Sequence, residues 1–243
     1  MSQLESIRIV LVETFHPGNI GAAARAMKTM GLKDLVLVNP IEFPHSEAAS
    51  RAAGAIDLLE NVRIESSLKA ALSDCQQVFA TSARKQHTFG RPQQSCEETV
   101  EWIKKHSEIK TAIVFGPERT GLSAEDIQQC DRLLYIPGNP EYDVLNMAAA
   151  VQIVCYELHR QINSESSALS IAKEIEEPAT KSEVEGFYQQ LESLLKERGY
   201  IRDSQPTDTM KKLGNMFNKT QMTSAEVSMM RGVIKALTRN KQA

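Results

Sequence analysis

The sequence predicts an α/β fold with a parallel sheet, followed by a small helical extension. Short β-branched runs alternate with helical patterns from Ile7 to Ile162, which is typical of a parallel sheet covered by helices. Residues 163–180 are rich in serine and glutamate and break this rhythm, and only helical patterns follow. We therefore expect an α/β domain over residues 1–162, a linker over 163–180 and a helical extension over 181–243.

Five segments of the first domain have the composition of buried strands. They are short, aliphatic and β-branched, and turn-forming or polar residues bound them. We expect each strand to be followed by a loop and then a helix. The five predicted strands are Ile7–Val12, Leu35–Val38, Val78–Ala80, Thr111–Phe115 and Leu133–Ile136.

Several helices of this domain carry start or stop signals. An alanine-rich run from Ile20 to Met30 ends at Gly31, a residue that commonly follows a helix. Ser123 with Asp126 three residues later approximates a capping box. The helix predicted over Leu145–Ile162 is apolar through most of its first three turns, so we expect it to be buried on more than one side.

The extension is predicted to hold three helices and to be basic. The helical patterns cover Ser182–Glu197, Thr207–Phe217 and Ser224–Arg239, and Thr223 with Glu226 forms a capping box for the last. From residue 196 onward there are ten Lys or Arg against four Asp or Glu, although the whole chain has a net charge of −3. A basic tail suits a polyanionic partner, and a solvated helical surface is the alternative.

Composition and motifs exclude several classes of protein. No stretch approaches the roughly eighteen unbroken apolar residues of a membrane helix, so we expect a cytoplasmic protein without a membrane partner. The four cysteines form no Cys-x-x-Cys pair and the five histidines lack metal-ligand spacing, so no metal is expected. Glycine-rich loops for dinucleotides or triphosphates and a Gly-x-Ser-x-Gly elbow are also missing.

Three loops after predicted strands are candidates for a ligand site. In an open parallel sheet, ligands bind beyond the carboxyl ends of the strands. The loops are 13–19, 116–122 and 137–146. Gly116 and Gly121 permit a close backbone approach or a positive φ, although simple turn glycines are the alternative. The residues themselves therefore predict an α/β protein with a binding crevice.

Together, these loops resemble the three signature motifs of the trefoil-knotted SPOUT methyltransferases. The matching segments are Asn19–Lys28, Gly116–Leu122, and the run 136–139 with Leu145–Asn146. The resemblance implies a C-terminal trefoil knot in the α/β domain, S-adenosylmethionine as cofactor, methyl transfer to an RNA ribose 2′-hydroxyl, and a homodimer. None of these follows from periodicity or spacing.

The resemblance also reaches the tail, which is similar to the C-terminal extension of the TrmJ group of tRNA ribose 2′-O-methyltransferases. The segments that carry it are Phe187–Tyr188 with Leu191, Gly199–Arg202, Lys212–Leu213 and Met230–Gly232. This group implies tRNA as partner and cytidine or uridine at anticodon-loop nucleotide 32 as target. Ribosomal RNA, another tRNA position, and a non-catalytic RNA-binding homologue stay open as alternatives.

The resemblance assigns roles to individual residues. Arg25 and Asn19 are the catalytic candidates, with Arg25 clamping a phosphate and polarising the hydroxyl and Asn19 orienting Arg25 or the ribose. The candidates for contact with RNA are Lys28, Lys211, Lys212 and Arg231. The candidates for the cofactor slot are Thr81, Ser82, Ala83, Gly116, Glu118, Gly121, Ile136, Asp143, Val144, Leu145 and Asn146.

Further expectations concern Glu118, Val144 and the dimer. Glu118 is expected to brace its loop, with an orientation toward the cofactor as the alternative. Many relatives have serine where this chain has Val144, so a hydrogen bond from a hydroxyl is lost there. Arg25 of one subunit is expected to face the cofactor of the other, and the apolar face of the Leu145–Ile162 helix is a candidate dimer surface. An intramolecular core is the alternative for that face.

Overall fold

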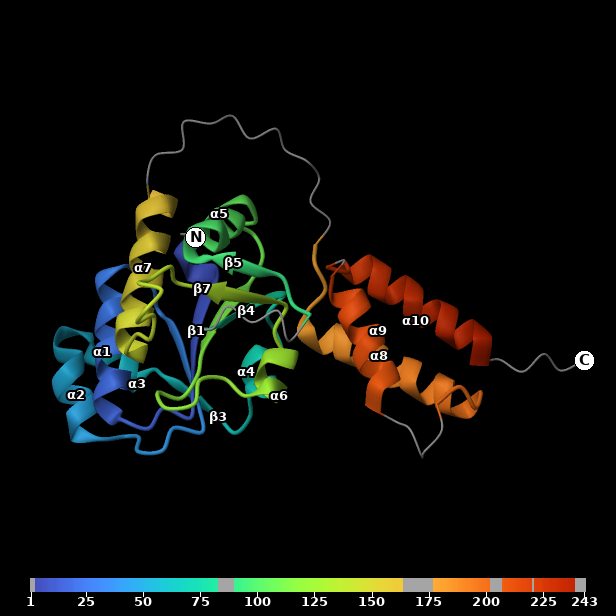
Figure 1. The fold of residues 1–243 in the computed structure, drawn as a ribbon, viewed down its shortest axis with the longest axis horizontal. Coiled ribbons are helices and arrows are strands. Elements are labelled where there is room, and N and C mark those ends of the chain that lie inside the picture. Colours follow the sequence, from blue (N-terminus) through green and yellow to red (C-terminus); the bar gives the residue numbers. More distant parts are fainter. Residues whose placement is uncertain (1–2, 83–89, 164–176, 202–206, 220, 239–243) are drawn as a thin grey trace, which may run out of the picture. The chain divides into compact units, whose positions relative to one another are not determined.

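A computed structural model of the chain describes residues 3–82, 90–163, 177–201, 207–219 and 221–238. The chain divides into two compact units, Met1–Ser170 and Ile171–Ala243. Figure 1 shows a sheet with helices in the first unit and helices alone in the second. Most of the predicted linker lies outside the described residues, so the limits at 162 and 181 stay predictions.

The first unit contains one parallel sheet with strand order β3-β2-β1-β6-β4-β7-β5. All five predicted strands are confirmed. Two edge strands of three residues were not predicted, because they are too short to show a period. The strands are β1 Ile7–Val12, β2 Asp34–Val38, β3 Arg63–Glu65, β4 Gln77–Thr81, β5 Gln93–Ser95, β6 Thr111–Phe115 and β7 Arg132–Tyr135.

Helices cover both faces of this sheet (Figure 1). Successive side chains of β1 point to opposite faces, so Ile9 joins one apolar cluster with α1 and α7 while Val10 joins another with α4 and α6. The helices are α1 Pro17–Thr29, α2 Ser46–Ala52, α3 Ile56–Glu60, α4 Leu68–Leu72, α5 Cys96–Lys105, α6 Ala124–Gln128 and α7 Met147–Asn163, with 3-10 turns at Gln3–Ser6 and Ala53–Ala55.

The local helix signals of the first unit are confirmed. Gly31, with φ +83°, follows the last residues of α1, which ends at Thr29. Ser123 and Asp126 form a reciprocal capping box at the start of α6. The strand predicted at Val78–Ala80 was expected to lead into a helix. Residues 83–89, directly after β4, lie outside the described residues, so this connection stays a prediction. The next described element is the short strand β5, and α5 follows.

The apolar face of α7 belongs to the core of its own unit. Val151, Val154, Cys155 and Leu158 are fully buried there and pack in the same cluster as α1 and β1. The intramolecular alternative is therefore confirmed for these four side chains. Ile153 and Tyr156 of the same helix stay at least partly exposed, so a dimer contact through α7 remains a prediction. A helix that packs between a sheet and neighbouring helices needs the same apolar pattern as a helix at a subunit interface, so the sequence could not separate the two.

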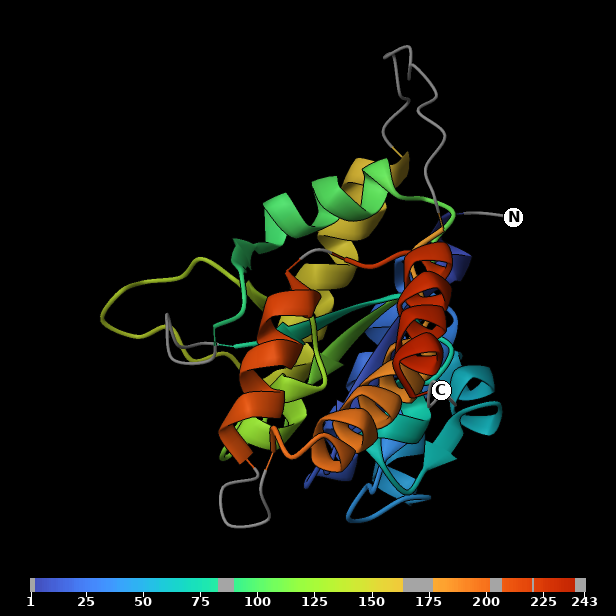
Figure 2. The ribbon, with the colours of Figure 1, turned by 90° about the vertical axis from the view of Figure 1, so that its right-hand side faces the viewer.

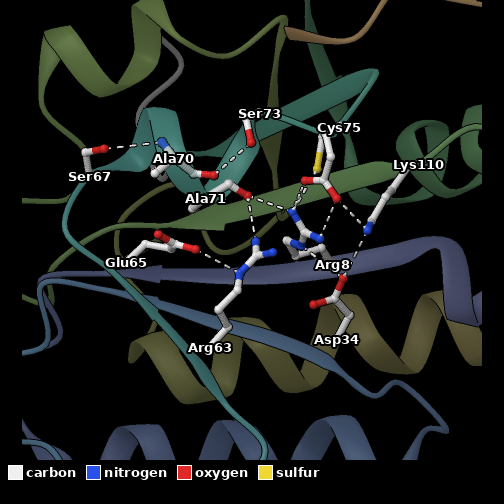
Figure 3. Close-up of polar contacts among 11 residues, drawn as sticks. Arg8, Asp34, Arg63, Glu65, Ser67, Ala70, Ala71, Ser73, Cys75 and Lys110 are labelled. Atoms are coloured by element: carbon white, nitrogen blue, oxygen red, sulfur yellow. Dashed lines mark hydrogen bonds and ion pairs between the residues drawn. The ribbon is translucent and has the colours of Figure 1, made fainter. Parts of the chain in front are cut away.

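A buried arginine joins the amino ends of the strands (Figure 3). Arg8 on β1 is 2% exposed and donates to Asp34 Oδ2 at 2.9 Å, Asp74 Oδ1 at 2.6 Å and the Ala71 carbonyl at 2.7 Å. Lys110 also contacts Asp74, at 2.7 Å. The hydrogen bond from Arg8 holds the pKa of Asp74 well below its usual range, against the effect of burial. This cluster ties the sheet together at the amino ends of its strands, opposite the carboxyl ends.

The described part of the second unit holds three helices, and Figure 2 shows them from a second direction. They are α8 Lys181–Glu197, α9 Thr207–Asn218 and α10 Ser224–Thr238, so the predicted helices are confirmed to within about two residues. Phe187, Leu194, Val227 and Ile234 form their apolar core. In the described ranges, no helix has the length and apolarity needed to cross a bilayer.

Candidate active site

A cavity of about 290 Å³ lies beyond the carboxyl ends of β6, β4 and β7. These three strands are neighbours in a parallel sheet, so the loops that follow them meet at one edge. The volume is close to the lower end of the range for small-molecule sites, which begins at about 300 Å³. Its walls are Thr81, Ser82, residues 115–122, Ile127, Leu134, Ile136, residues 143–145, Met147 and Ala150.

The cavity brings together most of the residues predicted for the cofactor slot. Asn146 does not line it, and Ala83 lies outside the described residues. The sequence reasoning missed apolar walls at Leu134, Ile127 and Met147, which come from strand β7 and helices α6 and α7. Their positions next to the predicted loops were the only available signal, because a buried aliphatic residue looks the same whether it faces a cavity or the core.

The two glycines of the 116–122 loop are needed by the loop itself. A Cβ atom on Gly116 would lie 2.3 Å from the backbone nitrogen of Leu122 and 2.5 Å from the carbonyl carbon of Gly121. Gly121 has φ +67° and donates from its backbone to the Pro117 carbonyl at 2.9 Å. Glycine is therefore required for the tight return of this loop. The positive φ predicted for these glycines is confirmed at Gly121, and a close approach of the backbone to a ligand stays a prediction.

Glu118 braces the loop onto the start of α1. Its carboxylate accepts hydrogen bonds from the backbone nitrogens of Phe15 at 2.9 Å and His16 at 3.2 Å, and from Asn19 Nδ2 at 2.7 Å. Partial burial raises the pKa of Glu118, but these hydrogen bonds outweigh it and leave the pKa below its ordinary value. An ionised, fully engaged carboxylate fits the bracing role.

Asn146 extends this network to the third loop. Its Nδ2 donates to Asn19 Oδ1 at 3.2 Å, while its own Oδ1 accepts from the backbone nitrogens of Ala148 at 2.9 Å and Ala149 at 3.3 Å. Asn146 thus caps the start of α7 and at the same time holds Asn19. A chain of side chains, Glu118–Asn19–Asn146, joins all three loops that the sequence singled out.

Val144 and Leu145 form an apolar part of the cavity wall that solvent also reaches. Their side chains are 60% and 43% exposed, respectively. Neither carries a hydroxyl, so neither can make the hydrogen bond that a serine at position 144 could make. Asp143 beside them is exposed and lines the same cavity.

Arg25 lies on α1 but outside the cavity of its own chain. Its side chain is exposed, and it is not among the residues that line the cavity. Asn19, predicted to orient Arg25 or the ribose, instead bonds Glu118 and Asn146. Positions six apart on a helix differ by about 240°, so these two side chains point in different directions.

The predicted RNA contacts fall in both units. Lys28 on α1 already donates to Asp57 Oδ1 at 2.6 Å and to the Gly54 carbonyl at 2.9 Å, so a phosphate would compete with Asp57 for it. In the second unit, Lys211 and Lys212 are exposed on α9. Arg231 on α10 is exposed and donates to Gln190 Oε1 at 3.0 Å.

Comparison with known families agrees with this arrangement. The model of the SpoU rRNA Methylase family matches residues 6–156, which include all three loops. The model of the C-terminal domain of the tRNA methyltransferase TrmJ matches residues 182–243. The chain belongs to the SpoU methylase family and carries a TrmJ C-terminal domain. The resemblance to the SPOUT enzymes and to the TrmJ group is thereby confirmed.

Relatives of this SpoU family member match over nearly the whole chain. The tRNA (cytidine/uridine-2′-O-)-methyltransferase TrmJ of Photorhabdus laumondii is 41% identical and the match covers 96% of this chain and 97% of the relative. The tRNA (cytidine/uridine/adenosine-2′-O-)-methyltransferase TrmJ of Pseudomonas aeruginosa is 37% identical over 95% and 93%. The crystal structure of TrmJ from Z. mobilis ZM4 superimposes with a TM-score of 0.82 at 32% identity, over 96% and 99%.

Proposed function

We propose that the protein is an S-adenosylmethionine-dependent tRNA ribose 2′-O-methyltransferase that acts on cytidine or uridine at anticodon-loop nucleotide 32. The observation that carries the proposal is a cavity that is walled by two of the signature loops and tied to the third by Glu118 and Asn19. The names of the relatives support the tRNA substrate and the ribose chemistry. Nucleotide 32 rests on the resemblance to the TrmJ group.

The cavity suits S-adenosylmethionine. Ile136 and Leu145 offer apolar walls for an adenine, and the hydroxyl-bearing side chains of Thr81 and Ser82 lie at the carboxyl end of the neighbouring strand β4. The backbone of the 116–121 loop would hold polar edges of the base, as implied by the resemblance. When bound, S-adenosylmethionine supplies an electrophilic methyl group on a sulfonium.

Arg25 would serve the acceptor ribose. A guanidinium stays protonated at neutral pH, so it can clamp a phosphate beside the target and polarise the hydroxyl, but it is poorly suited to remove the proton. Asn19 contributes by position, because its bonds to Glu118 and Asn146 fix the first turn of the helix that carries Arg25. Methyl transfer depends strongly on such positioning of the reacting atoms.

A homodimer would bring Arg25 to a cavity. Arg25 is exposed and does not line the cavity of its own chain, which supports a role at the site of a second subunit. The test mixes Arg25→Ala protein with a cavity-defective Gly116→Ala variant. In a heterodimer, the Arg25→Ala cavity receives the intact Arg25 of the other subunit, so random mixing restores roughly a quarter of wild-type activity. No restoration would show that Arg25 acts within its own chain.

The basic tail would track tRNA phosphates. Lys211, Lys212 and Arg231 are exposed cations on the second unit, and contacts of this kind give affinity that falls with salt and reads no sequence. Lys28 would join them if a phosphate displaces Asp57. A cytoplasmic location follows from the tRNA substrate and stays a prediction.

The decisive experiment measures methyl transfer from labelled S-adenosylmethionine to an unmodified tRNA transcript with cytidine at position 32. The matched control is the same transcript with a 2′-deoxy sugar at that nucleotide only, which removes the acceptor oxygen. Transfer that disappears with the control supports the proposal. Equal transfer to both transcripts would show that the methylated nucleotide is not nucleotide 32. Binding of the transcript without any transfer would favour the non-catalytic alternative.

A further inference from the structure

An aromatic ring and a guanidinium lie in contact at the rim of the cavity. Phe15 belongs to the loop between β1 and α1, and its side chain is 51% exposed. Arg119 belongs to the loop after β6, is exposed and lines the cavity. The Cζ atom of Arg119 lies 4.8 Å from the centroid of the Phe15 ring, within the range of a cation–π contact. We call these two residues the rim pair.

The backbone beneath the rim pair is held from two sides. The backbone nitrogen of Phe15 donates to Glu118 Oε2 at 2.9 Å, and that of His16 donates to Glu118 Oε1 at 3.2 Å. The carbonyl of the preceding residue, Thr14, accepts from the backbone nitrogen of Ile41 at 3.2 Å. A fixed backbone presents the ring to solvent with little freedom left to lose, which lowers the entropic cost of binding a partner.

Arg119 keeps its charge available at this rim. Within the described residues its guanidinium has no hydrogen-bond or ion-pair partner. Its cation–π contact with the Phe15 ring is the interaction that the structure shows for it. Single exposed apolar residues are common on protein surfaces and need no function. A ring and a guanidinium in contact beside a reaction cavity form a different arrangement, because both present flat surfaces of the type on which single-stranded bases stack.

We propose that the rim pair is the stacking platform for the base of the nucleotide that is methylated. The inference rests on the proposed function. The ribose 2′-hydroxyl has to reach the cavity, and the base is attached to the same sugar, so the base must lie close to the rim. Every base has a π-face, so stacking on Phe15 and Arg119 accepts cytidine and uridine alike without reading their edges.

The test replaces the ring while keeping its apolar bulk. Phe15→Leu removes the π-face, Phe15→Trp retains one, and Ile64→Ala on β3 is the matched control, because Ile64 is also 51% exposed. The full-length proteins, saturated with S-adenosylhomocysteine, are titrated with a tRNA transcript that carries the fluorescent analogue pyrrolocytidine at position 32. Stacking of this base on the platform changes its fluorescence on binding.

Phe15→Leu is expected to raise the Kd for the transcript about tenfold, which corresponds to about 1.4 kcal/mol, and to abolish the fluorescence change. Phe15→Trp should keep both near wild type, and Ile64→Ala should change neither. Calorimetric affinity for S-adenosylmethionine should be the same in all four proteins, since the platform contacts RNA and not the cofactor.

Two results would overturn the platform. One is wild-type affinity and fluorescence in Phe15→Leu, and the other is a loss of S-adenosylmethionine affinity in that variant, which would make Phe15 a support of the cavity wall. Failure of the proposed function is seen separately, as absence of methyl transfer by the wild-type protein. The binding measurements do not depend on methyl transfer, so they test the stacking role of the rim pair whether or not the protein transfers a methyl group.

Discussion

Replacing Gly116 by alanine should disable the cavity while leaving the rest of the fold in place. The added Cβ would lie 2.3 Å from the Leu122 nitrogen, about 1 Å short of the 3.4 Å at which ordinary contact begins. The atoms it meets are backbone, so the loop of residues 116–122 has to move by about that distance. Overpacking of this kind costs about 1–3 kcal/mol of unfolding free energy.

The functional loss should exceed the loss of stability. Glu118 belongs to the displaced loop, so its bonds to Phe15, His16 and Asn19 are disturbed together. A misplacement of about 1 Å near a reacting centre can lower the rate about 100-fold. We expect kcat/KM for methyl transfer to fall by that factor, with weaker binding of S-adenosylmethionine by calorimetry.

A matched variant distinguishes an effect of this loop from a general effect of replacing glycine by alanine. Gly54→Ala meets no atom within 4 Å and has no positive φ, so urea unfolding, calorimetry and methyl transfer should match the wild type. If Gly116→Ala remains folded and has wild-type affinity and kcat/KM, then the tight return of this loop does not shape the cavity and the reasoning fails.

Three further outcomes are expected. Arg25→Ala should lower kcat by at least about 100-fold while the affinity for S-adenosylmethionine persists, and retained activity would contradict a catalytic role. Reversing the charges of Lys211 and Lys212 to glutamate should raise the Kd for tRNA and flatten the slope of log affinity against log salt by about 2, whereas an unchanged slope would return these lysines to a solvated surface. Because the pKa of Asp74 is lowered in the folded state, its bond to Arg8 stabilises the protein fully above about pH 4 and less as the pH falls below that value. In urea unfolding at pH 7 and pH 3, Asp74→Asn should be less stable at pH 7 and less sensitive to acid, and a pH dependence equal to wild type would refute this assignment.

The sequence by itself determined the elements and the identity of the loops. Strand positions follow from β-branched runs, and helix ends follow from Ser123, Thr223 and Gly31, because capping and backbone preferences act within a few residues. The resemblance of the three loops named the SPOUT family, which the family match confirmed. The edge strands β3 and β5 were not predicted, because three residues are too few to show the alternation of a strand.

Only the tertiary structure decided how distant residues meet. Strand order places the 116–122 loop against the start of α1, so Glu118 reaches Asn19 across 99 residues and Asn146 reaches it across 127. It also turned the apolar face of α7 inward and left Arg25 outside its own cavity. These outcomes depend on which strands are neighbours, and that arrangement is set by the packing of the whole sheet, not by any local stretch of residues.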